Sequence, residues 1–376
     1  MGNVTCLYLI RHAEAEGNIF RRAHGQYDGL LMPNGLDQLA ALSKRFEDVE
    51  LDAVYTSDLY RARRTALAVG LSARPDERLR EIYLGPWEDK PWGWCNQEYP
   101  GEFAAFMRRL SEFRLEGAET LRQTADRMEA AVREIAQRHA GGCVAIVSHG
   151  MSIRALLGRM LNIPDGDIEQ LPHMDNASVS LLRIGPDGAA STDYHGDADH
   201  LGELSTLAKQ HWWRTETTAY ETGLWYRPAD LRTELDEVIR RQRKTWLGVY
   251  GNEQGYNADI ARENIKTMAA ANPRCVQFIL NLDEVMGLLL LDPNNGNGST
   301  GHIALLAMDE KYCDQGLGIQ PLGEAISFYR ALGRSALSLY VHPGNTRAIR
   351  FYAKAGFRKT GEKSSATGTL DIMCRS

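Results

Sequence analysis

Two apolar segments that lie far apart in the sequence each run directly into a histidine. Residues 6–10 are followed by Arg11 and His12, and residues 143–147 are followed by Ser148 and His149. Continuous apolar segments of this length that stop at polar residues are typical of strands buried on both faces. In open α/β sheets, ligands bind at the carboxyl ends of such strands. The two segments therefore predict an α/β sheet with a pair of histidines at one edge.

Further polar groups follow other predicted strand ends in the same half of the chain. Asn18 lies in the segment of small residues after the first histidine. Residues 51–56 predict a short strand, and Ser57 or Asp58 can cap the helix that follows it. Arg61 then falls in the first turn of that helix, just beyond a strand end.

Together these groups form a chemically coherent set. His12 can act as a nucleophile that accepts a phosphoryl group on a ring nitrogen. Arg11 and Arg61 carry planar, permanently charged guanidinium groups that match phosphate oxygens. His149 and Asn18 can donate further hydrogen bonds to the phosphate. The nearby arginines should keep His12 neutral, as a nucleophile must be. Such a site can transfer a phosphoryl group by positioning and charge stabilisation, without a metal.

A carboxylic acid must also protonate the departing alkoxide. We assign this role to Glu81, because it lies in an otherwise apolar, turn-rich segment. Glu14, Glu16 and Glu88 remain alternatives.

The order and spacing of these motifs resemble those of the histidine phosphatase superfamily, which includes phosphoglycerate mutases and many small-molecule phosphatases. The matching pieces are Arg11-His12-Ala13-Glu14, Ser57-Asp58-Leu59-Tyr60-Arg61-Ala62, Glu81 with Gly85 and Trp87-Glu88, and Ser148-His149-Gly150. The resemblance covers residues 1–205 and implies a three-layer α/β/α domain of the phosphoglycerate mutase type. By this resemblance, His12 forms a phosphohistidine intermediate, Glu81 donates the proton, and the phosphate is bound by Arg11, Asn18, Arg61 and His149.

Two departures from the family pattern favour a phosphatase over a mutase. Where the family often has Pro-Leu-Thr, this chain has Leu30-Leu31-Met32, which removes a hydroxyl contact. The chain also lacks the longer insertion that mutases usually carry before the final strand. Ala13 replaces a common glycine, which is a mild change. His24 and Gln26 either line the mouth of the pocket or belong to a plain loop.

One cluster of residues invites a metal-site interpretation. In an extended segment, His195, Asp197 and Asp199 would share a face, with His200 beside them. This segment follows residues 178–184, which we interpret as the last strand of the domain. We therefore favour a solvated connector and expect no metal site.

The second half of the chain contains a strand, a glycine-containing loop and a helix in succession. Residues 301–308 predict the strand, residues 309–318 the loop, and residues 319–332 the helix. Free backbone N–H groups at the start of such a helix bind phosphate groups.

This arrangement, with residues 345–357 after the next strand, resembles the GNAT superfamily of acyl-CoA N-acyltransferases over residues 222–376. The resemblance implies an α+β domain with a mixed, mostly antiparallel sheet and acetyl-CoA as cosubstrate. It implies that Tyr352 protonates the departing thiolate, that Asn345 contacts the cofactor, and that the CoA pyrophosphate is held by the backbone of Gln315, Gly316, Leu317 and Gly318.

The acetyltransferase-like half departs from its family at one position. Cys313 stands where the family usually has Gln or Arg, so a side-chain contact is lost while the backbone contacts remain. For the base that activates the acceptor amine, Glu284, Asp309 and an ordered water are the candidates.

Length and composition fit a two-domain soluble protein. A chain of 376 residues is too long for one ordinary core. We expect domains at residues 1–205 and 222–376, joined by an aromatic-rich connector at 206–221 that packs between them. The net charge of -6 predicts no nucleic-acid or membrane partner. Six scattered cysteines and the absence of a long apolar segment favour the cytoplasm, and the sequence is compatible with a homodimer.

We therefore predict a bifunctional enzyme. Its first domain hydrolyses a small phosphate monoester, and its second transfers an acyl group from CoA to an amine. One alternative is a phosphatase whose second domain binds acetyl-CoA only as a regulator. The other is a phosphoglycerate-type mutase.

Overall fold

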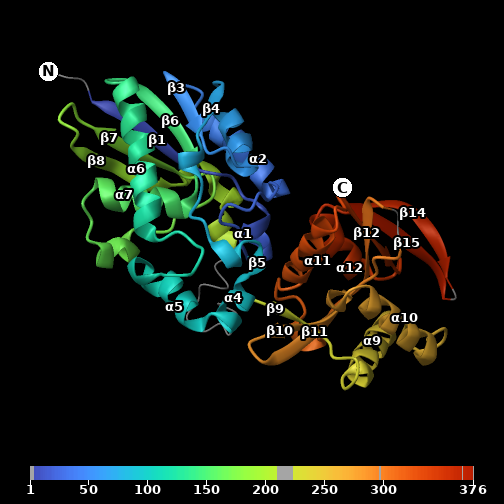
Figure 1. Ribbon diagram of the computed structural model, residues 1–376. Coiled ribbons are helices and arrows are strands. Elements are labelled where there is room, and N and C mark those ends of the chain that lie inside the picture. The colour runs from blue at the N-terminus through green and yellow to red at the C-terminus, as the bar shows by residue number, and fades with distance from the viewer. Residues whose placement is uncertain (1–3, 210–222, 296–297, 366, 376) are drawn as a thin grey trace. The chain divides into compact units, whose positions relative to one another are not determined.

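The computed structural model describes residues 4–209, 223–295, 298–365 and 367–375 (Figure 1). The chain divides into two compact units, one of residues 1–90 with 95–221 and the other of residues 91–94 with 222–376. The predicted connector at 206–221 lies almost wholly outside the described residues, including Trp212, Trp213 and Tyr220. Each unit is described by itself.

The first unit is built on a six-stranded sheet with the order β4-β3-β6-β1-β7-β8. Its strands are β1 (Thr5–Arg11), β3 (Ala53–Thr56), β4 (Ala73–Pro75), β6 (Cys143–Ser148), β7 (Val179–Ile184) and β8 (Ala190–Asp197). The first four in spatial order are parallel, whereas β7 and β8 are antiparallel additions beside β1. Arg11 pairs with Ser148, so both predicted histidines follow their strands at the same edge.

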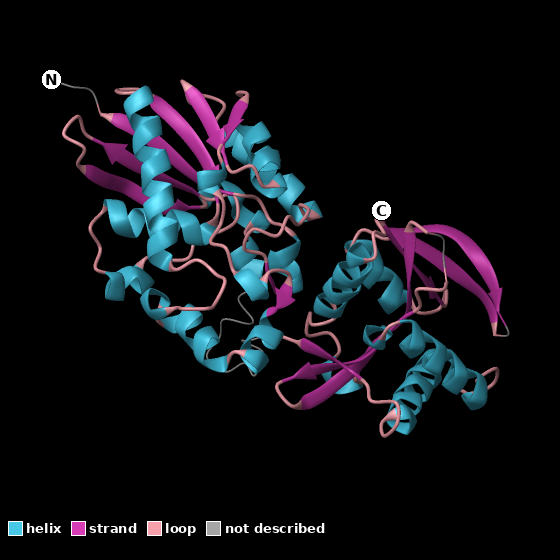
Figure 2. Ribbon diagram, in the orientation of Figure 1, coloured by secondary structure: helices cyan, strands magenta, loops and turns pink. Residues whose placement is uncertain are grey.

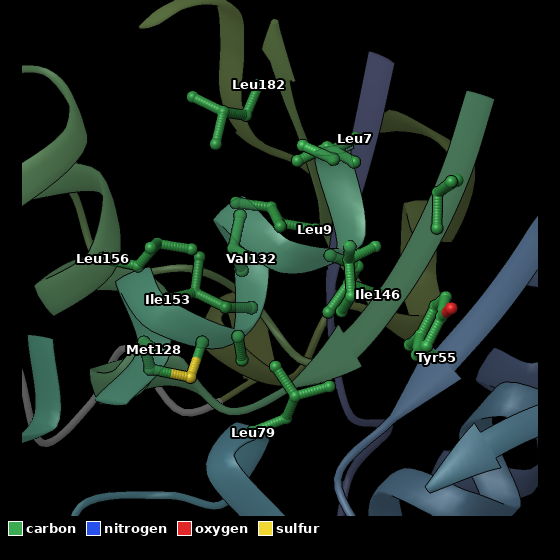
Figure 3. Packing of buried hydrophobic residues seen from close by; sticks show 14 of the residues in the cluster. Leu7, Leu9, Tyr55, Leu79, Met128, Val132, Ile146, Ile153, Leu156 and Leu182 are labelled. Carbon is green, nitrogen blue, oxygen red and sulfur yellow. The ribbon is translucent and has the colours of Figure 1, made fainter. Parts of the chain in front are cut away.

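Helices cover both faces of this sheet, which confirms the predicted three-layer α/β/α domain (Figures 1 and 2). On one face, α6 (Leu121–Arg138) and α7 (Gly150–Met160) pack on the apolar side chains of β1, β6 and β7 (Figure 3). On the other face, α2 (Pro33–Arg45) and α3 (Tyr60–Ala66) cover Ile10, Val54 and Val147. The remaining short elements are α1 (Glu16–Phe20), β2 (Arg22–Ala23), β5 (Lys90–Pro91), α4 (Trp92–Glu98), α5 (Pro100–Arg108) and α8 (Thr206–Lys209).

The sequence of α6 explains both its start and its packing. Thr120 caps the helix by accepting a hydrogen bond from the backbone N–H of Gln123 at 3.2 Å, and Gln123 reaches back to the backbone N–H of Thr120. Met128, Val132 and Ile135 recur at helical spacing and are all buried. The helix therefore presents one apolar stripe to the sheet.

The interpretation of residues 178–184 as the last strand was wrong. Residues 190–197 form β8, which pairs with β7 at the edge of the sheet. Its sequence is polar, and most of its side chains are at least partly exposed. An edge strand needs no continuous apolar segment because one of its sides has no neighbouring strand.

The second unit is built on a seven-stranded sheet with the order β14-β15-β13-β12-β11-β10-β9. Its strands are β9 (Trp225–Pro228), β10 (Val276–Asn281), β11 (Glu284–Leu291), β12 (Thr300–Met308), β13 (Ala336–Val341), β14 (Arg358–Ser365) and β15 (Gly368–Arg375). All neighbours are antiparallel except β12 and β13, which confirms the predicted mixed, mostly antiparallel sheet. The parallel pairing covers only residues 300–303 with 336–339, so β12 continues beyond it without β13.

The helices of this unit are α9 (Leu235–Tyr250), α10 (Ala258–Ala271), α11 (Ile319–Ala331) and α12 (Thr346–Lys354). Asp230 accepts hydrogen bonds from the backbone and the side chain of Arg232, and α9 begins after Glu234. Among the described residues, no helix is both long and apolar enough to cross a membrane.

Gly301 offers a test of packing in the second unit. A Cβ atom at this position would lie 2.2 Å from Cγ of Tyr329, whose hydroxyl donates a hydrogen bond of 2.6 Å to the His302 carbonyl. We expect Gly301→Ala to lower the free energy of unfolding by about 1–3 kcal/mol, because a fully buried ring must move. Urea unfolding monitored by fluorescence measures the change.

Gly248→Ala is the matched control. It lies inside α9 with nothing within 4 Å of its Cβ position, so it should raise stability by up to about 1 kcal/mol. Equal effects of the two substitutions would contradict the packing at Gly301.

Candidate functional site

His12 follows β1 and is held in one defined orientation. Its side chain is only 4% exposed, and Nδ1 lies 2.8 Å from the carbonyl oxygen of Ala13. Because a carbonyl can only accept, Nδ1 carries the proton and Nε2 keeps its lone pair. Burial lowers the pKa of His12 well below its usual value, and Arg61 and Arg11 lower it further. His12 is therefore neutral, as predicted for a nucleophile.

His149 lies beside His12 at the start of α7. The two ring centroids are 5.1 Å apart, and His149 is fully buried. Neither of its ring nitrogens has a hydrogen-bond partner in the described part of the chain. Burial and then the charge of Arg61 lower its pKa well below the usual value. A buried polar ring without protein partners is suited to bind a ligand.

Arg61 brings a buried guanidinium to the same edge from α3. Its Nη1 donates to the carbonyl of Tyr27 at 2.8 Å and its Nη2 to the carbonyl of Gly25 at 2.6 Å. The Nε atom is buried and has no partner among the described residues. Burial lowers the pKa of Arg61 to about 10. The guanidinium is thus fixed by loop residues 25–27.

Arg11 and Asn18 are oriented by the segment that precedes β7. Arg11 donates to the carbonyl of Met174, and its side chain lies against Gly150, where a Cβ atom would be 3.2 Å from Nε. The Oδ1 of Asn18 accepts hydrogen bonds from the backbone of Ala15 at 3.0 Å and from Asn176 at 3.2 Å. The amide NH2 of Asn18 therefore lies on the opposite side of the group from these contacts.

Asn176 is a site residue that sequence reasoning missed. Besides contacting Asn18, it donates to the carbonyl of His12 at 3.0 Å. The run Asp175-Asn176 directly before a predicted strand was the available signal. It becomes informative only once β7 is known to run antiparallel to β1, because its amino end then meets the carboxyl end of β1.

Glu81 lies at the start of α7, the helix that follows His149, but the expected semi-apolar setting was wrong. Its carboxylate accepts hydrogen bonds from the backbone of Met151 at 3.2 Å and Ser152 at 2.9 Å, and from the Ser152 hydroxyl at 3.1 Å. These groups belong to the first turn of α7, whose N-terminus attracts negative charge. Ser152 is a second residue that the sequence analysis missed.

The other candidate carboxylates are engaged elsewhere. Glu14 accepts from Asn34 at 3.0 Å and from Thr206 at 2.8 Å, and Glu16 accepts from the backbone of Leu30 at 3.1 Å. Glu88 accepts three backbone N–H groups, and burial raises its pKa.

The predicted cluster at residues 195–200 does not converge on one point. His195 lies between Ser180 and the carbonyl of Pro172, whereas Asp197 pairs with Arg45 at 2.7 Å and His200 also contacts Arg45. In the described part of the chain, no group of three His, Cys, Asp or Glu side chains is arranged to hold a metal ion.

The second unit presents a run of backbone N–H groups at the start of α11. Gly316 has a φ of 74°, and Gly318 is the N-cap of the helix. Within the described residues, the N–H groups of Gln315, Gly316, Leu317 and Gly318 have no acceptor. Four such donors at a helix N-terminus fit the pyrophosphate of an acyl-CoA.

Residues predicted to act on the acyl-CoA lie on or beside α12. Asn345 caps this helix, and its Oδ1 accepts from the backbone of Ala348 at 3.1 Å. Arg347 ties α12 to the glycine loop through an ion pair with Asp314 at 3.1 Å. Tyr352 packs between the rings of Phe351 and Phe357, and burial raises its pKa. Tyr352 therefore remains a protonated phenol.

Cys313 and the two carboxylates suggested as bases all have partners within the second unit. The Cys313 thiol points back to the carbonyls of Met308 and Asp309, at 3.7 and 3.5 Å. Among the suggested bases, Asp309 pairs with Arg241 at 2.8 Å and Glu284 with Lys311 at 2.7 Å. Neither carboxylate is free of a cation.

Comparisons with known proteins agree with this description. Residues 7–195 match the histidine phosphatase superfamily (branch 1), and residues 235–357 match the acetyltransferase (GNAT) family. A probable phosphoglycerate mutase GpmB of Klebsiella pneumoniae is 31% identical over 180 residues, which are 47% of this chain and 83% of the relative. The same-named protein of Salmonella choleraesuis is 29% identical over equal shares. The solved structure of Bacillus stearothermophilus YhfR is 34% identical with a TM-score of 0.51, and the match covers 52% of this chain and 99% of YhfR.

The neutral buried histidines make stability depend on pH. Both His12 and His149 have pKa values lowered in the folded state, so below pH 6.5 the unfolded chain binds more protons at these positions. The contribution of these two histidines to the free energy of unfolding therefore falls as the pH falls. Between pH 6.5 and 5.5, the free energy of unfolding of His149→Gln should fall by about 1 kcal/mol less than that of wild type. Urea unfolding at the two pH values measures the difference.

Leu156→Ala serves as the control, since it removes a buried side chain of α7 without changing a titratable group. It should lower stability equally at both pH values. A His149→Gln protein with the wild-type pH dependence would show that His149 is not held neutral.

Proposed function

The chain belongs to the histidine phosphatase superfamily and carries a GNAT domain, and from this premise we propose a bifunctional enzyme. The phosphatase domain, residues 1–205, hydrolyses a small phosphate monoester. The acetyltransferase domain, residues 222–376, acetylates an amine with acetyl-CoA. Residues 206–221 connect them.

The orientation of neutral His12 is the observation that carries the phosphatase proposal. Its Nε2 attacks phosphorus, and the bond from phosphorus to the ester oxygen breaks. Arg11, Arg61, Asn18 and His149 surround the phosphoryl oxygens and stabilise their charge. The buried Nε–H of Arg61 and the single ring N–H of neutral His149 are donors that support this role, because neither has a partner among the described residues.

Glu81 transfers a proton in each of the two steps of the reaction. It passes a proton to the departing alkoxide and later accepts a proton from the water that attacks the phosphohistidine. The products are the alcohol and inorganic phosphate. The first proton can arrive with the substrate, because the second pKa of a phosphate monoester is about 6. The hydrogen bonds from Met151 and Ser152 support this role by fixing the carboxyl group at the start of α7, the helix that follows His149.

In the second domain, residues 315–318 would hold the pyrophosphate and Asn345 would contact the cofactor. Bound acetyl-CoA supplies a thioester whose acyl carbon an amine can attack. Tyr352 would protonate the departing thiolate, and its burial as a neutral phenol supports that role.

Two alternative functions each have one observation in their support. The Klebsiella relative is a probable phosphoglycerate mutase, which makes a mutase of that type the second candidate for the first domain. Phosphorus-31 NMR separates the two, because a mutase yields an isomeric ester and a phosphatase yields inorganic phosphate. Cys313 favours a second domain that binds acetyl-CoA only as a regulator.

The role of Glu81 predicts a dependence on the leaving group. We expect Glu81→Gln to lower kcat/KM for an alkyl phosphate by about 10²–10⁴-fold. For p-nitrophenyl phosphate, whose leaving group needs no proton, the loss in the first step should be less than about tenfold. Single-turnover kinetics with both esters measure the difference.

His12→Ala is the companion variant and should abolish turnover of both esters. It should also abolish the acid-labile phosphoenzyme that a rapid quench traps in wild type. Hydrolysis that persists without His12 would overturn the mechanism, and an equal loss for both esters in Glu81→Gln would remove Glu81 from the role of proton donor.

Tyr352 distinguishes an acetyltransferase from a regulatory domain. We expect Tyr352→Phe to lower amine acetylation by at least about 100-fold while acetyl-CoA still raises Tm, because the ligand binds the folded state of both proteins. A panel of primary amines with a thiol-release assay measures turnover. No acetylation by wild type, together with an acetyl-CoA effect on phosphatase rate, would support the regulator instead.

A further inference from the structure

We propose that Glu88 is a positioning residue that holds the Arg61 guanidinium in place through the loop of residues 25–28. This inference rests on the proposed phosphatase function and adds a residue to the same site.

Both carboxylate oxygens of Glu88 are committed to backbone N–H groups. Oε1 accepts from Gln26 and from Leu84, both at 2.9 Å, and Oε2 accepts from Tyr27 at 2.5 Å. Two of these donors lie in the loop and the third lies on Glu88's own segment. The carboxylate thus joins two pieces of chain about 60 residues apart.

The other side of the same loop contacts Arg61. The carbonyls of Gly25 and Tyr27 accept from the two terminal nitrogens of the guanidinium, at 2.6 and 2.8 Å. Asp28 accepts from the backbone of Tyr60 at 2.7 Å, which ties the loop to the start of the helix that carries Arg61. Glu88 therefore holds the N–H group of the Gly25–Gln26 peptide, whose carbonyl binds the Arg61 guanidinium, and the N–H group of Tyr27, whose own carbonyl binds it as well.

Two further observations support a specific contact between Glu88 and the loop. Gly25 has a φ of 48°, and a Cβ atom there would lie 1.9 Å from Oε1 of Glu88, so the close approach requires glycine. Gln26 also donates from its side chain to the carbonyl of Glu81 at 3.1 Å, so the loop contacts the backbone of the proposed proton donor. Loss of Glu88 should disturb both Arg61 and Glu81.

The loop has a second attachment that does not use Glu88. Arg22 forms an ion pair with Asp89 at 2.8 Å, and the backbone of Asp89 donates to the carbonyl of Ala23 at 2.8 Å. A Glu88 variant should therefore fold with the loop docked but less ordered.

The test measures inorganic phosphate binding by phosphorus-31 NMR titration, which needs no turnover and detects millimolar Kd values. Glu88→Gln keeps the shape but turns an NH2 group toward backbone N–H donors. We expect it to weaken phosphate binding by about tenfold. In an Arg61→Gln background the same change should have an effect of less than about twofold, because Glu88 acts through Arg61.

Amide hydrogen exchange gives an independent readout. The N–H groups of Gln26 and Tyr27 should exchange faster in Glu88→Gln, while those of the β1 strand stay as in wild type. Glu50→Gln, an exposed position, is the matched control and should change neither measurement.

An unchanged phosphate Kd in Glu88→Gln, or an equal weakening with and without Arg61, would overturn the inference. If either result is found and the wild-type protein hydrolyses phosphate esters, the proposed function remains intact. A wild-type protein that binds phosphate and responds to Glu88→Gln as expected, but hydrolyses no ester, retains the positioning role and loses the phosphatase function. A wild-type protein that binds no phosphate overturns both.

Discussion

The first unit depends on holding the positive charge of Arg61 out of water without an ion pair. Arg61 is 1% exposed, and no carboxylate of the described residues forms a salt bridge with it. Two backbone carbonyls hold it instead, and the charges of Glu81, Asp28 and Glu88 act on it from a distance. Burying a charge without a direct partner is costly, so the site is stabilised when an anion enters.

The same charge sets the protonation of the neighbouring histidines. Burial comes first among the causes that keep His12 and His149 neutral, and Arg61 comes next for both. A neutral His12 with its proton on Nδ1 can use Nε2 as a nucleophile. In the proposed phosphatase mechanism, the groups that bind the phosphate and the histidine that reacts with it are therefore coupled through one buried arginine.

Under the proposed functions, the two units offer phosphate groups different kinds of donor. In the first, side-chain guanidinium and imidazole groups gather at the carboxyl edge of a parallel sheet. In the second, the backbone N–H groups of residues 315–318 precede α11 after the end of β12. Charged side chains can stabilise charge that changes during a reaction, whereas backbone donors suit a group that is bound and remains unchanged.

Local sequence was enough to determine the strand-end histidines, Arg61 beyond its strand, and the glycine loop before α11. Each depends on one apolar segment and the few residues that follow it. Residue roles that depend on contacts between distant segments required the tertiary structure. Asn176 reaches His12 across 164 residues, Ser152 reaches Glu81 across 71, and Glu88 reaches Gln26 across 62. The polar edge strand β8 was likewise missed, because its pairing comes from β7 and not from its own apolar pattern. The sequence by itself thus determined which groups could react, and only the tertiary structure decided how they are held, because backbone donors and carbonyls carry no signature in the residue types.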